Sequence, residues 1–287
     1  MYGAIIGDIA GSRYEFYPVK TKDMPLFAKG SRFTDDTVLT VAVANALLEA
    51  RKTGASFKEL LVPEMRRMAL AYPDAGYGGR FATWLGSADP SPYGSFGNGS
   101  AMRVSPCGLI AVTLEEALDL ARASAEITHN HSEGIKGAQA VAGAVFLAKT
   151  RHTKEEIRAF VQGGYYNLDF TLDEIRAGYG FNETCQGSVP QAIVAFLEAE
   201  SYEDAIRGAI SLGGDADTQA AIAGSIAWSY YRFRLESGQG NSPESFDKPG
   251  IRWPQWCQDM VEKNGINAFL PADFVDTIKR LDKVWMQ

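Results

Sequence analysis

Residues 213–231 read GGDADTQAAIAGSIAWSYY, and residues 34–50 read TDDTVLTVAVANALLEA. Each stretch places aspartates and a threonine directly before a long run of small and apolar residues, the composition of a buried helix. Gly213 and Gly214 are typical of a position where one helix stops before the next begins. We therefore expect two helices whose small side chains allow close packing and whose N-termini meet.

The rest of the chain carries the same helical signals. Ser/Thr-x-x-Glu/Gln patterns, typical of helix N-termini, begin at Thr113, Thr153, Thr171 and Ser188. Helical spacing predicts helices over 36–51, 56–71, 133–149, 218–234, 254–264 and 272–285, a further helix that ends before Gly213, and loops over 86–106 and 236–255. Alternation with a period of two residues is scarce. The sequence predicts an all-α, compact helical bundle, with residues 1–287 as a single domain.

Composition excludes several classes of protein. The 287 residues carry 28 Lys and Arg against 35 Asp and Glu, a net charge of −7, which argues against non-specific nucleic-acid binding. No apolar segment reaches the roughly 18–20 residues of a membrane helix, and the N-terminus lacks the features of a signal peptide. Cys107, Cys185 and Cys257 lie too far apart for a zinc motif and suit reduced thiols. We expect a cytoplasmic protein without a membrane partner.

The two opening stretches would bring four carboxylates together. Asp35, Asp36, Asp215 and Asp217 would repel one another, and neither stretch contains a cluster of Lys or Arg. With the hydroxyls of Thr34 and Thr218 they offer only hard oxygen ligands, which suit Mg²⁺, Mn²⁺ or Ca²⁺. Six such oxygens are enough for two ions used in hydrolysis. The alternative is that these residues only cap helices.

Five ordered segments resemble one family. GDIAGSRYE (7–15), TDDT (34–37), GNGSAMRVSP (97–106), THNHSEGIKGA (128–138) and LGGDADTQAAIAGSIA (212–227) are similar to motifs of the ADP-ribosylglycohydrolases, the relatives of dinitrogenase-reductase-activating glycohydrolase. The resemblance implies a compact all-α fold and a centre of two Mg²⁺ or Mn²⁺ ions. It also implies hydrolysis of the bond between ADP-ribose and a modified side chain or small acceptor.

The resemblance also implies roles for individual residues. The metal ligands are Thr34, Asp35, Asp36, Asp215, Asp217 and Thr218; the catalytic carboxylates are Glu15 and Asp35; the substrate contacts are Gly97, Asn98, Gly99, Ser100, Met102 and His129. Glu15 is expected in a short turn after the first helix, where it would serve as an acid or base.

The chemistry of the diphosphate and of adenine also indicates which residues would contact the substrate. Backbone N–H groups of residues 97–100 would bind the diphosphate, because glycine permits a close approach. Phe181 is preferred over Tyr93, Phe96 and Tyr179 for stacking on adenine. Some bacterial relatives carry an aspartate before the Gly-Asn loop where this chain has Ser95 and Phe96, so the identity of the acid or base stays open.

The function expected from the sequence is that of a metal-dependent glycosidic hydrolase. Its partner would be an ADP-ribosylated protein, modified on arginine or serine, or a small-molecule conjugate of ADP-ribose. Two alternatives are a metal-dependent phosphohydrolase of a nucleotide and a non-catalytic protein that binds ADP-ribose. Release of AMP would distinguish the phosphohydrolase, and lost metal ligands would indicate the binding protein, whereas both metal motifs are intact here.

Overall fold

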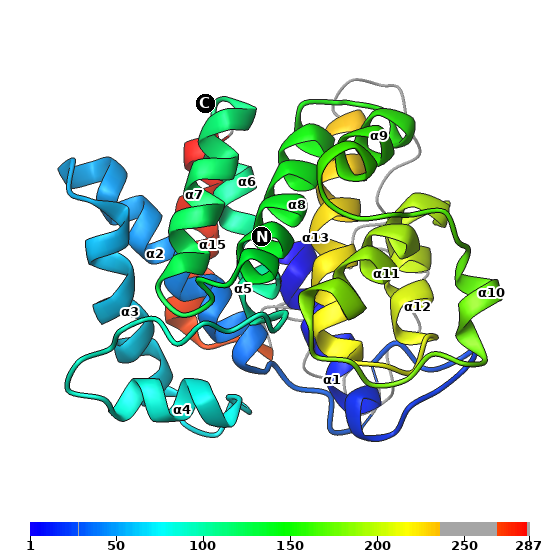
Figure 1. Cartoon of the computed structure of the whole chain (residues 1–287), viewed down its shortest axis with the longest axis horizontal. Helices are drawn as coiled ribbons and strands as arrows, with labels where there is room; N and C mark the ends of the chain where they lie inside the picture. Colours follow the sequence, from blue (N-terminus) through cyan, green and yellow to red (C-terminus); the bar gives the residue numbers. More distant parts are fainter. Residues whose placement is uncertain (28, 236–268, 286–287) are drawn as a thin grey trace.

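The computed structural model describes residues 1–27, 29–235 and 269–285, which form helices joined by loops (Figure 1). The helices are α1 (Tyr2–Phe16), α2 (Asp35–Thr53), α3 (Phe57–Ala71), α4 (Gly79–Gly86), α5 (Gly99–Met102), α6 (Ser105–Ile110), α7 (Leu114–Glu126), α8 (Ser132–Lys149), α9 (Lys154–Gly164), α10 (Leu172–Arg176), α11 (Cys185–Glu198), α12 (Tyr202–Ile210), α13 (Ala216–Leu235) and α15 (Ala272–Trp285). Within the described ranges the extended pairing is a single β-bridge between Gly97 and Thr184. The all-α prediction is confirmed.

Helices α1 and α13 form the centre of the fold (Figure 1). They run antiparallel, because Gly3, Gly7 and Gly11 of α1 face progressively earlier residues of α13. A Cβ atom at Gly7 would collide with the carbonyl group of Ala220, and one at Gly11 would collide with the backbone at Ala216. Glycine is therefore required along this face of α1, since only a missing side chain lets the two backbones come so close.

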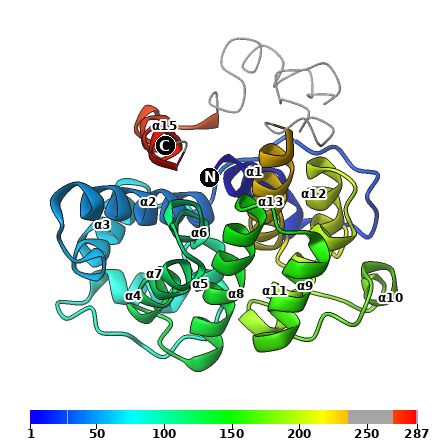
Figure 2. The ribbon, with the colours of Figure 1, turned by 90° about the horizontal axis from the view of Figure 1, so that it is seen from above.

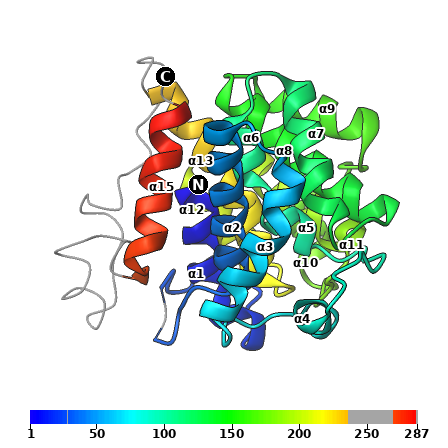
Figure 3. The same ribbon diagram turned by 90° about the vertical axis from the view of Figure 1, so that its left-hand side faces the viewer.

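The remaining helices surround this pair. Helices α2, α3 and α4 lie on one side, α10, α11 and α12 on the other, and α8 lies between them (Figure 1). Seen from above, α15 covers the outer side of α2 (Figure 2), where the Thr277 hydroxyl donates to the Asn45 side-chain oxygen at 2.8 Å. A view from the side shows α15 running alongside α2 and α13 (Figure 3). Buried side chains from both flanks belong to one hydrophobic core.

Most predicted helices are present, with boundaries set by local caps. Thr34 accepts a hydrogen bond from the Asp36 N–H at the start of α2, and Gly54, with φ of 75°, ends that helix. Thr153 and Thr171 form complete capping boxes with Glu156 and Glu174. Thr113 caps α7 through the Glu116 N–H. The predicted helix 254–264, the loop 236–255 and Cys257 lie outside the described residues, and one domain over 1–287 stays a prediction.

Three local expectations were wrong. The 86–106 segment is not a continuous loop, because it contains α5 and the start of α6. Ser188 does not cap a helix: Thr184 caps α11, and the Ser188 hydroxyl bonds back to the Thr184 carbonyl inside it. Glu15 does not follow α1 in a turn but lies in its last helical turn.

The cysteines and the hydropathy of the helices can also be compared with the sequence expectations. Cys107 and Cys185 are free and buried, as expected of reduced thiols. In the parts of the chain that the structure describes, no helix combines the length and apolar character needed to cross a bilayer.

The α1–α13 contact leads to a test of stability. Gly7→Ala should lower the free energy of unfolding by about 1–3 kcal/mol, because the new methyl group forces two backbones apart. Gly163→Ala in α9 is the matched control: its Cβ would meet nothing within 4 Å, so it should be neutral or stabilise by up to about 1 kcal/mol. Urea unfolding followed by circular dichroism measures both. Equal stability of the two variants would contradict the close packing.

Candidate active site

The N-terminus of α2 contributes three oxygen-bearing side chains. Thr34 precedes the helix, and Asp35 and Asp36 form its first turn. The Asp35 N–H donates to the Ala75 carbonyl at 2.9 Å, which fixes the backbone at this point. Asp36 is buried; its Oδ2 accepts from the Thr218 hydroxyl at 3.2 Å, and its Oδ1 has no hydrogen-bond partner among the described residues.

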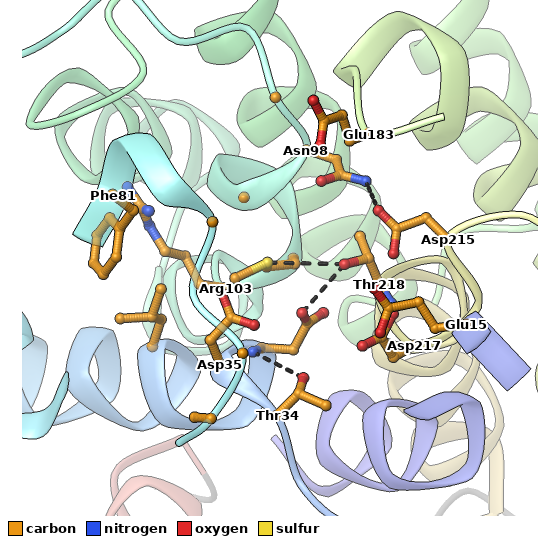
Figure 4. Close-up of a pocket in the computed structure, with 18 of the residues that line it drawn as sticks. Glu15, Thr34, Asp35, Phe81, Asn98, Arg103, Glu183, Asp215, Asp217 and Thr218 are labelled. Atoms are coloured by element: carbon orange, nitrogen blue, oxygen red, sulfur yellow. Dashed lines mark hydrogen bonds between the residues drawn. The ribbon is translucent and has the colours of Figure 1, made fainter. Parts of the chain in front are cut away.

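The N-terminus of α13 supplies the second set. Asp215 caps the helix, since its carbonyl accepts from the Gln219 N–H, and the Asn98 amide donates to its Oδ2 at 2.7 Å. Asp217 accepts from the Thr218 N–H at 2.9 Å. The hydrogen bond between Thr218 and Asp36 joins this helix to α2 (Figure 4). The expected meeting of the two helix N-termini is therefore present in the structure.

Glu15 reaches the same place from the end of α1. One carboxylate oxygen from each of Glu15, Asp215 and Asp217 lies within 4.8 Å of the others, and Figure 4 shows the three side chains grouped beside Thr218. The last turn of a helix, rather than a turn after it, holds Glu15 in position. Helix packing thus brings together carboxylates that are about 200 residues apart in the sequence.

Burial and mutual repulsion perturb these carboxyl groups strongly. Burial, followed by the charge of Asp217, raises the pKa of Asp35, Asp36 and Asp215 well above the ordinary value. The same two causes raise the pKa of Glu15 to about 7, which Arg32 only partly offsets. Burial also raises the pKa of Asp217, and hydrogen bonding, above all with Asp215, opposes that rise.

In the described part of the chain, no basic side chain forms an ion pair with the cluster. Within the described ranges, none of the ion pairs shorter than 4.0 Å involves Glu15, Asp35, Asp36, Asp215 or Asp217. The group therefore offers hard, anionic oxygens to a divalent cation, as the sequence predicted. The unpartnered Oδ1 of Asp36 is the atom most clearly lacking a donor or cation.

A cavity of about 390 Å³ opens over the carboxylates. Its walls include, from the predicted site, Glu15, Thr34, Asp35, Asp36, Gly97, Asn98, Gly99, Met102, His129, Phe181, Asp215, Asp217 and Thr218. Ser100 is the exception, because its side chain is fully buried and donates to the Gly134 carbonyl at 2.7 Å. Tyr93 and Phe96 line the cavity as well, whereas Tyr179 donates to the Gly187 carbonyl and is not among its walls.

The 97–100 loop is held by its own hydrogen bonds. The Asn98 N–H donates to the Glu183 carbonyl at 2.8 Å and the Gly97 N–H to the Ser95 hydroxyl at 3.2 Å, so these two amides are already used. The helical start of α5 leaves the N–H groups of Gly99 and Ser100 without an intrahelical acceptor. Because Ser100 is fully buried and does not line the cavity, a ligand anion would meet only the Gly99 N–H of the four expected donors.

His129 faces this loop from a buried position. Burial and the nearby Arg103 charge lower its pKa well below the ordinary value, so the ring is neutral. The Thr128 hydroxyl accepts from Arg103 and lies 2.7 Å from Nδ1 of His129, which favours donation to Nδ1 and leaves the ring proton on Nε2. A Cβ at Gly99 would lie 3.2 Å from that Nε2.

Sequence reasoning missed several residues of the site. Asp8, fully buried in α1, accepts hydrogen bonds from Thr34 and Thr37 at the start of α2. Arg103, Glu183 and Phe81 line the cavity. Arg103 and Asp8 lie inside segments quoted from the sequence. The available signal was a charged residue within a run of small and apolar residues, and the structure shows that both side chains are buried.

Comparisons with known proteins concern the family and the fold. The chain is 28% identical to the human protein named ADP-ribosylhydrolase ARH3, over 91% of this chain and 88% of that one. It is 26% identical to ADP-ribosylarginine hydrolase Tri1 of Pseudomonas putida (strain GB-1), over 92% of this chain and 76% of that one. A solved structure described as an ADP-ribosylglycohydrolase-related protein complex has a similar fold, with a TM-score of 0.58, 21% identity, and coverage of 99% of this chain and 94% of that one.

A family model extends the match beyond single relatives. The model described as ADP-ribosylglycohydrolase matches residues 1–234, which include both helix N-termini, Glu15 and the 97–100 loop. This chain belongs to the ADP-ribosylglycohydrolase family.

Proposed function

We propose that the chain is a metal-dependent hydrolase that cleaves the glycosidic bond between ADP-ribose and a modified protein side chain or small acceptor. The observation that carries the proposal is the convergence of carboxylates from α1, α2 and α13 in one cavity, where none of them forms an ion pair shorter than 4.0 Å with a described basic side chain. Family membership supports ADP-ribose glycohydrolase activity in general. The name of the Pseudomonas relative supports arginine as one acceptor. Serine and small molecules remain alternative acceptors, as expected from the sequence resemblance.

The donor set suits two Mg²⁺ or Mn²⁺ ions. Thr34, Asp35, Asp36, Asp215, Asp217 and Thr218 would hold them; all six line the cavity and offer only oxygen. The unpartnered Oδ1 of Asp36 supports this fit, because a buried carboxylate oxygen otherwise lacks a partner. When bound, the ions would neutralise charge and act as Lewis acids at the scissile bond.

Glu15 is the acid or base that we prefer. Its raised pKa, about 7, allows it to hold a proton near neutral pH and to give it to the leaving acceptor, or to take one from the attacking water. Asp35, which also lines the cavity, is the alternative. Negative charge from the surrounding carboxylates would stabilise the oxocarbenium-like transition state of glycosidic cleavage.

The part of the cavity beside the 97–100 loop would bind the rest of ADP-ribose. The Gly99 N–H and the Nε2–H of His129 are donors for the diphosphate or distal ribose, whereas Ser100 is fully buried behind them. Met102 lies between the loop and Thr218, with its sulfur 3.9 Å from the Thr218 hydroxyl. Phe181, at the cavity wall and 59% exposed, would stack on adenine. A cytoplasmic location remains a prediction from the sequence.

Turnover with defined substrates tests the proposal. The protein should release ADP-ribose from arginine-linked or serine-linked substrates in the presence of Mg²⁺ or Mn²⁺, and EDTA should stop the reaction. Asp217→Asn should abolish release, whereas Asp119→Asn, the same charge change on an exposed part of α7, should not. Release of AMP instead would indicate a phosphohydrolase, and binding of ADP-ribose without turnover would indicate a non-catalytic protein.

The raised pKa values predict how pH affects stability without metal. Unfolded carboxyl groups have a pKa near 4, whereas Asp8 and Glu15 reach about 7 in the folded chain. Between these two pKa values the folded state binds more protons than the unfolded state. These carboxyl groups therefore lower the free energy of unfolding as pH rises through this window. Mn²⁺ should therefore raise the melting temperature more at pH 8 than at pH 5.

Differential scanning fluorimetry with and without Mn²⁺ measures this difference. The comparison removes the effect of the buried Met1 amino group, whose pKa is lowered to about 5 and which acts in the opposite direction. Asp36→Asn should reduce the Mn²⁺ effect at both pH values. An equal shift at pH 5 and pH 8 in the wild-type protein would argue against a cation among these carboxylates.

Glu15→Gln separates chemistry from binding. Loss of a positioned acid or base should lower kcat by roughly 10²- to 10⁴-fold with a smaller change in KM. Glu59→Gln, on the exposed side of α3, is the control for the same substitution and should retain full activity. Single-turnover cleavage gives the rate constant of the chemical step, independently of product release. Full-rate cleavage by Glu15→Gln would transfer the role to Asp35.

A further inference from the structure

Asp8 lies beneath the proposed metal site without facing it. It is 1% exposed in the middle of α1, and it is not among the residues that line the cavity. Its carboxylate contacts the N-terminus of α2 instead. Oδ1 accepts from the Thr34 hydroxyl at 2.7 Å, and Oδ2 accepts from the Thr34 N–H at 2.9 Å, the Thr37 N–H at 3.1 Å and the Thr37 hydroxyl at 2.5 Å.

The two oxygens of Asp8 have different partners. Oδ2 receives two backbone N–H groups, which can only donate, so this position must be an acceptor. Oδ1 receives a single hydroxyl, that of Thr34, which could donate or accept. A carboxylate can only accept, so at this position it fixes the direction of the Thr34 hydrogen bond.

Fixing that direction determines what the Thr34 oxygen offers to the cavity. The hydroxyl hydrogen points to Asp8, and one lone pair accepts from the Asp36 N–H at 3.3 Å. A hydroxyl oxygen has two lone pairs, so one remains. Thr34 lines the cavity, so this remaining lone pair is available to a ligand there.

We infer that Asp8 is a positioning residue that holds the Thr34 hydroxyl with its hydrogen turned away from the cavity, so that the oxygen serves as a neutral ligand for a divalent cation. The inference rests on the proposed function, because it needs a cation at this site. Asp8 then has a role in metal binding in addition to capping α2. Capping α2 requires only the bonds from the two N–H groups, whereas the bond between Oδ1 and the hydroxyl controls the ligand.

Asp8→Asn tests this directly. The two N–H donors keep the amide oxygen at the Oδ2 position, so the NH₂ group falls where Oδ1 was and donates to the Thr34 oxygen. The Thr34 hydrogen must then turn elsewhere, and the oxygen loses its free lone pair. We expect Mn²⁺ affinity, measured by isothermal titration without substrate, to fall about 10- to 100-fold, as is usual when a residue supporting a ligand is changed.

Thr37→Val is the matched control. It removes a hydrogen bond from the same carboxylate, but from Oδ2, and leaves the Thr34 hydroxyl bound to Oδ1. We expect its stability to fall while its Mn²⁺ affinity stays near that of the wild-type protein. If Thr37→Val weakens Mn²⁺ binding as much as Asp8→Asn does, Asp8 only caps α2 and the inference is overturned.

A double-mutant cycle tests whether Asp8 affects Mn²⁺ affinity through Thr34. Thr34→Val should weaken Mn²⁺ binding, Thr34→Ser should restore it, and Asp8→Asn combined with Thr34→Val should be no weaker than Thr34→Val alone. Additive losses would overturn the inference. If Asp8→Asn folds only with Mn²⁺, the Mn²⁺ concentration that restores half of the helical signal provides the same comparison with Thr37→Val.

The outcomes distinguish a failure of the role of Asp8 from a failure of the proposed metal site. Wild-type affinity in Asp8→Asn would overturn this inference and leave the proposed metal site standing. Absence of Mn²⁺ binding by the wild-type protein would overturn the metal site itself, and the role of Asp8 with it.

Discussion

The backbone contact between α1 and α13 fixes the position of the carboxylates in the cavity. Gly7 packs against the backbone at Ala220, and this contact leaves no room for adjustment by side chains. Glycine inside a helix costs about 1 kcal/mol relative to alanine. The fold accepts that cost along one face of α1, and in return Glu15 and Asp217, carried by two rigid helices, are held at a set separation.

Helix α1 also controls the third element of the site. Asp8 directly follows Gly7 on the same helix and binds the start of α2 through Thr34 and Thr37. The position of α2 relative to α13 therefore depends on α1 twice, once through helix packing and once through hydrogen bonds. A shift of α1 would move both halves of the carboxylate cluster together, which explains how segments near residues 35 and 216 keep their register.

Much of this could be predicted from the sequence, for identifiable reasons. The capping boxes at Thr153 and Thr171 are local, and they appear as expected. Helix α5 was missed because its four residues are held by tertiary contacts, such as the Asn98 N–H to the Glu183 carbonyl, rather than by helix propensity. Asp8 was missed for the same reason: its partners lie 26 and 29 residues away.

The arrangement of charge explains why such a cluster can exist in a folded protein at all. Burying several carboxylates without cations nearby is unfavourable, as the raised pKa values of Asp35, Asp36 and Asp215 record. Two features reduce the cost: the positive ends of α2 and α13 lie beside the aspartates, and hydrogen bonds from Asn98 and Thr218 satisfy part of their oxygens. What remains unsatisfied, above all Oδ1 of Asp36, is the part of the cost that a divalent cation would remove under the proposed function.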